Sequence, residues 1–164
     1  MTHSPLLRHD QTLFRDPDVF EFTFVPDHLH HRDAQVQELA FLIRPARRGG
    51  SALSAVLRGP PGTGKTTTVR RLFREVTETT RQIIPAYVNC RHDRTPLAVY
   101  RSIFEQVHGY APPPVGRHLD EIRRGIAARL RDHDAALIVC LDDANELIPA
   151  GTYNTLLYQI LRLY

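Results

Sequence analysis

The sequence predicts an α/β protein with a parallel β-sheet flanked by helices. Short apolar segments alternate with amphipathic helical patterns, a glycine-rich loop follows the first of these segments, and a later apolar run ends in two aspartates. Alternation of strands and helices is typical of parallel sheets covered by helices. A chain of 164 residues is long enough for one such domain with a hydrophobic core and too short for two.

Hydrophobic spacing predicts the elements of the N-terminal half. Residues 1–25 contain aromatic side chains without a sustained period, and we interpret them as an extended arm. From residue 33 to 43, apolar residues recur at i, i+3, i+4 and i+7, which predicts a helix that Pro45 and the glycines after it end. Residues 51–59 (SALSAVLRG) predict a short strand that leads into the glycine loop. Helical spacing returns from Val69 to Val76.

The C-terminal half predicts two further strands and three helices. The segment QIIPAYVNC, residues 82–90, is predicted as a strand, and Pro85 inside it indicates an edge or an early position. The run AALIVCLDD, residues 135–143, is typical of a strand buried on both faces. The three helices are expected over residues 96–108, 119–130 and 152–164.

Composition excludes some classes of protein and leaves others open. No apolar run approaches the roughly 20 residues that span a bilayer, and the N-terminus lacks the apolar segment of a signal peptide. A net charge of +3 permits a nucleic-acid partner without indicating one. Cys90 and Cys140 share no metal-like spacing, so we expect buried thiols in a reducing cytoplasm. The histidines His28, His30 and His31 have no matching ligand pair and do not predict a metal site.

The segment GPPGTGKT satisfies the phosphate-loop pattern G-x-x-x-x-G-K-[ST] between a predicted strand and a predicted helix. Glycines bring backbone amides close to phosphate oxygens, and the helix start adds a positive dipole end. Lys65 is the only lysine in the chain, and its compact charge suits the β- and γ-phosphates better than the planar fork of an arginine. The hydroxyl of Thr66 is a predicted Mg²⁺ ligand. The predicted nucleotide-binding residues of this loop are Gly59, Pro60, Pro61, Gly62, Thr63, Gly64, Lys65, Thr66 and Thr67.

Two acids end the strand predicted over residues 135–143, and the run resembles a Walker B strand. Asp142 is expected to hold Mg²⁺ and its hydration shell, and Asp143 to polarise the attacking water as a catalytic residue together with Lys65. A strand that simply ends in acids at a turn is the alternative, and the phosphate loop earlier in the chain disfavours it. ATPases with a Walker B strand usually have glutamate at the second of the two acidic positions. The shorter Asp143 moves the carboxylate by about 1 Å, a misplacement that can cost on the order of a hundredfold in rate.

Several motifs together resemble one family. The phosphate loop and the later acidic strand resemble the AAA+ ATPases, which refines the expected fold to a P-loop NTPase of the AAA+ type. The segment FVPDHLHHRDAQVQELAFLIRPARRG resembles the N-terminal signature of the Orc1/Cdc6 replication initiators, particularly the archaeal ones. The elements YVNC, PPPVG and LLYQILRLY follow in the order of that family, so the resemblance covers residues 20–164.

The resemblance implies an ATP-dependent origin-recognition protein that helps to load the replicative helicase. It implies ATP or ADP with Mg²⁺ as cofactors, double-stranded origin DNA and the helicase as partners, and a cytoplasmic location. In the family the segment before the first helix lies against the adenine, and a helical insertion contacts DNA. The residues implied for the base are Val25, Pro26, His31 and Arg32. Those implied for DNA phosphates are Arg117, Arg123 and Arg124, for which a solvated helix face is the alternative.

The family also has elements that this sequence does not contain, namely a sensor strand, an arginine finger, a helical lid and a winged helix. Residues 26–164 are therefore expected to be the N-terminal part of an AAA+ domain, incomplete at the C-terminus and belonging to a longer protein. In the family the sensor strand lies between the strands that bear Lys65 and Asp142, so we expect these two strands not to pair. The chain alone is expected to aggregate and not to turn over ATP. The alternatives are a module that binds ATP without hydrolysing it, and another AAA+ or signalling ATPase with no DNA role.

Overall fold

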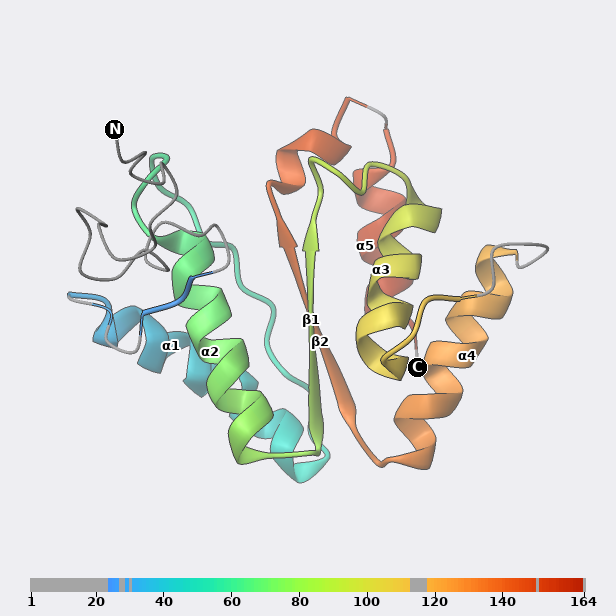
Figure 1. Ribbon diagram of the computed structural model, residues 1–164, viewed down its shortest axis with the longest axis horizontal. Coiled ribbons are helices and arrows are strands. Elements are labelled where there is room, and N and C mark those ends of the chain that lie inside the picture. Colours follow the sequence, from blue (N-terminus) through green and yellow to red (C-terminus); the bar gives the residue numbers. More distant parts are fainter. Residues whose placement is uncertain (1–23, 27–28, 30, 113–117, 150, 164) are drawn as a thin grey trace, which may run out of the picture.

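The computed structural model describes residues 24–26, 29, 31–112, 118–149 and 151–163. Two parallel strands form a central sheet, with helices on both faces (Figure 1), so the predicted α/β class is confirmed. Most of the arm expected over residues 1–25 lies outside the described residues. The strands are β1 (Ile83–Asn89) and β2 (Ala136–Asp142). One face of the sheet is covered by α1 (Asp33–Ile43) and α2 (Lys65–Thr79), and the other face by α3 (Pro96–His108), α4 (Leu119–Asp132) and α5 (Tyr153–Leu161). Two short 3-10 helices, η2 (Arg44–Arg48) and η3 (Ala144–Leu147), follow α1 and β2 in the chain.

The prediction of a β-strand over residues 51–59 is wrong. The segment belongs to no strand, and all residues from 51 to 60 are exposed. An extended segment becomes a strand only through ladder hydrogen bonds with a neighbour, and within the described residues the sheet consists of β1 and β2 alone. The expectation that this segment does not pair with the strand bearing Asp142 is confirmed.

The same lack of a neighbour explains a second correction, which concerns β2. The sequence predicts a strand buried on both faces, whereas all seven residues of β2 are only half-buried. One edge of β2 pairs with β1, from Ile83 opposite Ala136 to Asn89 opposite Asp142. Its other edge pairs with nothing in the part of the chain that the structure describes, so solvent reaches the strand from that side.

Two clusters of buried side chains hold the layers together. The larger cluster lies between the sheet and helices α3, α4 and α5 and includes Val88, Phe104 and Ile126. The smaller joins η2, α2 and the start of β1 through Ala46, Leu72, Val76 and Ile83. Of the apolar side chains on α5 only Leu156 is fully buried, and Leu161 is 70% exposed.

The outer edge of β1 is closed by two side chains. Alternate residues of a strand direct their backbone groups to the same side, so Pro85 and Tyr87 share the edge that faces away from β2. Pro85 has no N–H to offer there. Gln106 on α3 accepts a hydrogen bond from the Tyr87 N–H at 2.9 Å and donates one to the Tyr87 carbonyl at 2.8 Å. The edge position indicated by Pro85 is therefore confirmed.

Replacing Gln106 with alanine is expected to lower the free energy of unfolding by about 1 kcal/mol, because two backbone groups of Tyr87 lose their partner while remaining accessible to water. Urea denaturation followed by circular dichroism measures the change. Glu105→Ala is the matched control, since Glu105 is exposed on the same turn of α3. Equal unfolding midpoints for the two variants would show that the glutamine does not support the edge.

Candidate nucleotide and magnesium site

The phosphate-loop residues form a tight turn at the start of α2. Gly62 and Gly64 have φ angles of 76° and 82°, in the left-handed region that glycine adopts without strain. The Thr63 hydroxyl donates to the Pro60 carbonyl at 2.9 Å and folds the loop onto itself. Helix α2 begins at Lys65, so its first backbone N–H groups have no partner within the helix and face the loop. The geometry is that of an anion-binding helix N-terminus.

Lys65 lies across this loop. Its ammonium group donates to the carbonyl oxygens of Gly59 and Pro60, both at 2.9 Å. Carbonyl oxygens are neutral acceptors, and phosphate oxygens form stronger, charge-assisted bonds with an ammonium group. The same ammonium donors are therefore available to a phosphate oxygen that enters the loop.

The loop and the acidic strand end meet at Asp142. The Thr66 hydroxyl donates to Asp142 Oδ2 at 2.7 Å, although the two residues are 76 positions apart in the sequence. The backbone N–H of Asp143 donates to Asp142 Oδ1 at 3.2 Å. A hydroxyl and a carboxylate side by side are hard oxygen donors of the kind that Mg²⁺ prefers. The residues predicted for the metal therefore fit it.

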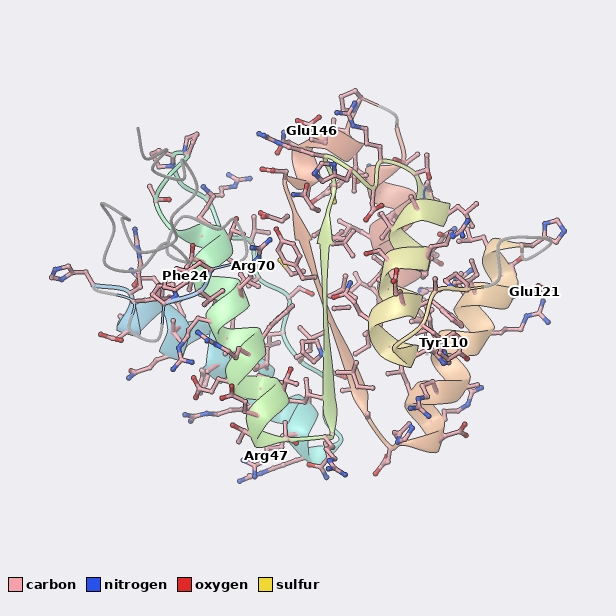
Figure 2. The ribbon with its side chains drawn as sticks, in the orientation of Figure 1. Phe24, Arg47, Arg70, Tyr110, Glu121 and Glu146 are labelled. Carbon is pink, nitrogen blue, oxygen red and sulfur yellow. The ribbon has the colours of Figure 1, made fainter. Side chains whose placement is uncertain are left out.

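Tyr87 also belongs to this site, and sequence reasoning missed it. Its hydroxyl donates to Asp142 Oδ2 at 2.6 Å, and the Arg70 guanidinium lies 4.7 Å from the centre of its ring. Figure 2 shows Arg70 on the side of α2 that faces the sheet. The residues Tyr87 and Asp142 share a sheet face because the register pairs Asn89 with Asp142. Strand alternation could have suggested the face, but only the register places the tyrosine beside the acid.

Asp143 lies at the end of β2 in a left-handed conformation, with φ 51°. Its carboxylate forms an ion pair with Arg91 Nε at 2.9 Å, and the two side chains are 37% and 64% exposed. A second pair, Arg94 with Glu146 at 3.8 Å, lies beside it. Exposed pairs of this kind contribute little to stability. The carboxylate nominated for the attacking water is therefore turned toward the loop that follows β1.

The four residues nominated for the base separate in space. Arg32 donates to the Thr63 carbonyl at 2.7 Å and lines a cavity of about 270 Å³ beside the phosphate loop. The carbonyl oxygens of Val25 and Pro26 instead accept from Arg74 on α2, at 2.8 and 3.4 Å. His31 is exposed, with φ 58°. Only Arg32 joins the loop cavity, and the base-side role of all four stays a prediction.

The cavity has four polar lining residues that sequence reasoning did not nominate, namely Gln35, Glu38, Arg58 and Thr68. Gln35 and Glu38 lie on α1 at i and i+3, so helical periodicity places them on one face with Leu42. The apolar side of the cavity comes from Leu39, Leu42 and residues 55–57. Polar and apolar side chains thus line the cavity in comparable numbers, which suits a ligand with both a polar and an apolar part.

The arginines nominated for DNA differ in their surroundings. Arg117 lies outside the described residues, as do His28 and His30. Arg123 contacts Asp120 at 3.5 Å and lies 5.8 Å from the centre of the Tyr100 ring, so the fold already uses it. Arg124 is exposed on α4.

The two cysteines differ from the predicted pair of buried thiols. Cys90 is fully buried, whereas Cys140 on β2 is only partly so, because one edge of that strand is open. Burial, with a smaller contribution from Asp93, raises the pKa of Cys90 to about 11, and burial raises the pKa of Cys140 to about 12. Both thiols are therefore protonated at neutral pH and weakly nucleophilic.

No helix in the described part of the chain is long and apolar enough to cross a bilayer.

A phosphate loop opening α2, joined through its threonine to an acid at the end of a parallel strand, defines a P-loop nucleotide-binding fold. The family model described as an AAA domain matches residues 47–164, and the chain belongs to that family. The expected refinement to the AAA+ type is therefore confirmed.

The relatives within this family agree with the resemblance drawn from the sequence motifs. The chain is 41% identical over 159 residues to ORC1-type DNA replication protein 6 of Halobacterium salinarum, covering 97% of this chain and 42% of that protein. The Aeropyrum pernix Orc1 protein, solved in complex with DNA, superposes with a TM-score of 0.76 at 34% identity, over 91% of this chain and 40% of that one. Cdc6p from Pyrobaculum aerophilum gives 0.67 at 32% identity, over 83% and 36%. The chain thus spans about two fifths of the length of these relatives, and the predicted Orc1/Cdc6 resemblance is confirmed.

Proposed function

We propose that the chain is the nucleotide-binding part of an ATP-dependent DNA replication initiator of the Orc1/Cdc6 type. The hydrogen bond from Thr66 to Asp142 carries the proposal, because it brings the phosphate loop and the acidic strand end together. ATP and ADP are the proposed ligands, with the phosphates at residues 59–67 and the base in the cavity beside Arg32.

The proposed roles of the side chains follow from their positions. Lys65 binds the β- and γ-phosphates, and the N–H groups at the start of α2 bind the remaining phosphate oxygens. Thr66 and Asp142 hold Mg²⁺, which when bound neutralises charge on the phosphates. Arg32 keeps the loop closed through its bond to the Thr63 carbonyl.

Titration with a fluorescent ATP analogue, in Mg²⁺ and again in EDTA, tests the nucleotide-binding proposal on the fraction of the chain that size-exclusion chromatography separates from aggregates. Saturable binding that Mg²⁺ strengthens, and that unlabelled ATP and ADP reverse, is the expected result. An absence of saturable binding in both buffers would overturn the proposal.

Duplex DNA and the replicative helicase are the proposed partners of the protein to which this chain corresponds. The Aeropyrum relative, which was solved in complex with DNA, supports the first, and the basic character of the chain, with a pI near 9.1, is compatible with it. Arg117, Arg123 and Arg124 are the proposed phosphate contacts. Fluorescence anisotropy with a labelled duplex should show weaker binding for Arg124→Glu at low salt and an equal affinity for Arg101→Glu, a substitution at an exposed arginine of α3.

The alternative of a module that binds ATP without hydrolysing it is not favoured, because the relatives of the chain are DNA replication proteins. The short side chain of Asp143 and its ion pair with Arg91 at 2.9 Å instead bear on the rate of hydrolysis. In a protein in which this chain is extended to the full length of its relatives, Asp143→Glu should raise the rate of ATP hydrolysis while the affinity for ATP stays the same. Equal rates of hydrolysis for the parent protein and the variant would contradict a rate-limiting role of the short side chain.

A further inference from the structure

Asp142 accepts three hydrogen bonds at the end of its strand. Oδ2 accepts two hydroxyl groups at once, from Thr66 at 2.7 Å and from Tyr87 at 2.6 Å. Oδ1 accepts one longer bond, from the Asp143 N–H at 3.2 Å. Two short bonds to one oxygen fix the rotation of the carboxylate. They leave Oδ1 as the oxygen with spare lone-pair capacity for a cation or its bound water.

The backbone N–H, the backbone carbonyl and the ring of Tyr87 all contact neighbouring side chains. The Gln106 side chain binds both its backbone N–H and its carbonyl, at 2.9 and 2.8 Å. The Arg70 guanidinium lies over its ring, 4.7 Å from the ring centre. The hydroxyl therefore reaches Asp142 from a fixed position on β1, whereas a donor on a flexible side chain would have no fixed position.

The phenol is also an uncharged donor. A neutral hydroxyl group stabilises a carboxylate without adding a positive charge that would compete with a cation.

We propose that Tyr87 is a positioning residue for the metal ion, whose hydroxyl fixes the Asp142 carboxylate and thereby sets the Mg²⁺ affinity of the nucleotide site. The inference rests on the proposed nucleotide-binding function and deepens it. Groups that orient a metal-binding carboxylate typically change metal affinity 10- to 100-fold when they are removed. A tyrosine that only satisfied its own hydroxyl would change stability and leave the metal dependence as it was.

The test compares the chain with its Tyr87→Phe variant, which removes a single oxygen atom. A fluorescent ATP analogue is titrated in EDTA and then, at fixed analogue concentration, with MgCl₂. We expect Tyr87→Phe to bind the analogue in EDTA within twofold of the parent chain, and to need about tenfold more Mg²⁺ for half of the metal-dependent signal. Tyr153→Phe is the matched control, because Tyr153 packs against the larger cluster on α5 and takes no part in the site. It should leave both values unchanged.

The outcomes separate the inference from the function on which it rests. If the parent chain binds the analogue in neither buffer, the proposed function and the inference both fail. If the parent chain responds to Mg²⁺ and Tyr87→Phe responds with the same midpoint, the inference alone fails. Binding in EDTA serves as the folding control, so a variant that lost affinity equally in both buffers would mark Tyr87 as structural and overturn the positioning role.

Discussion

Replacing Lys65 with methionine is expected to weaken ATP binding about 100-fold, or about 2.8 kcal/mol at 1.4 kcal/mol per tenfold. Methionine keeps most of the length and the apolar stem of the side chain and removes only the ammonium group. That group donates two hydrogen bonds at 2.9 Å within the loop, and the same donors are available to phosphate oxygens. Hydrogen bonds to charged groups contribute about 1.5–3 kcal/mol each. Isothermal titration calorimetry with ATP and Mg²⁺ measures the loss.

Arg81→Met is the control for this loss, because it removes the same charge from an exposed residue just beyond the C-terminal end of α2. It should bind ATP within twofold of the parent chain. If Lys65→Met bound ATP as tightly as Arg81→Met, the ammonium group would have no role in binding and the phosphate-loop assignment would be wrong.

Replacing Phe104 with alanine is expected to lower the free energy of unfolding by about 3–5 kcal/mol, as for other large buried aromatic side chains. Phe104 is 2% exposed in the larger cluster, and its ring stacks on His108 with 4.0 Å between centroids. A Cβ atom at Gly125 would lie 3.0 Å from this ring, so the glycine allows α4 to approach α3 closely. Loss of the ring would leave a cavity between the two helices, and urea denaturation measures the cost.

Phe41→Ala is the comparison for the core variant, since Phe41 is 63% exposed on α1. We expect it to change the free energy of unfolding by less than about 0.5 kcal/mol. Similar losses for the two variants would mean that α3 and α4 do not form the packed layer described here.

Local patterns predicted most of the helices. The bounds of α3 follow from Thr95, whose hydroxyl caps the helix by accepting from the Ala98 N–H at 3.2 Å, and from Gly109, which ends it at φ 79°. The phosphate loop was also predicted from the sequence, because its function depends on contiguous residues. These features need no information about distant parts of the chain.

The features that sequence reasoning missed all depend on contacts between distant segments. Residues 51–59 have the composition of a strand, but a strand also needs a partner, and composition does not provide one. The half-burial of β2 has the same origin. Tyr87 reaches Asp142 only because β1 and β2 pair in one particular register, and hydrophobic periodicity does not define the register between two strands.

The closed outer edge of β1 has a consequence for engineering by fragment complementation. Pro85 and Gln106 seal that margin of the sheet, whereas within the described residues no strand pairs with the other margin, along β2. A complementing peptide, whether supplied separately or fused to the chain, is therefore directed to β2 alone. It would run beside the strand that ends in Asp142, so its docking could be followed through the Mg²⁺ response of the nucleotide site. In a split reporter built on this sheet, the Mg²⁺-dependent signal would come from the strand to which the peptide docks.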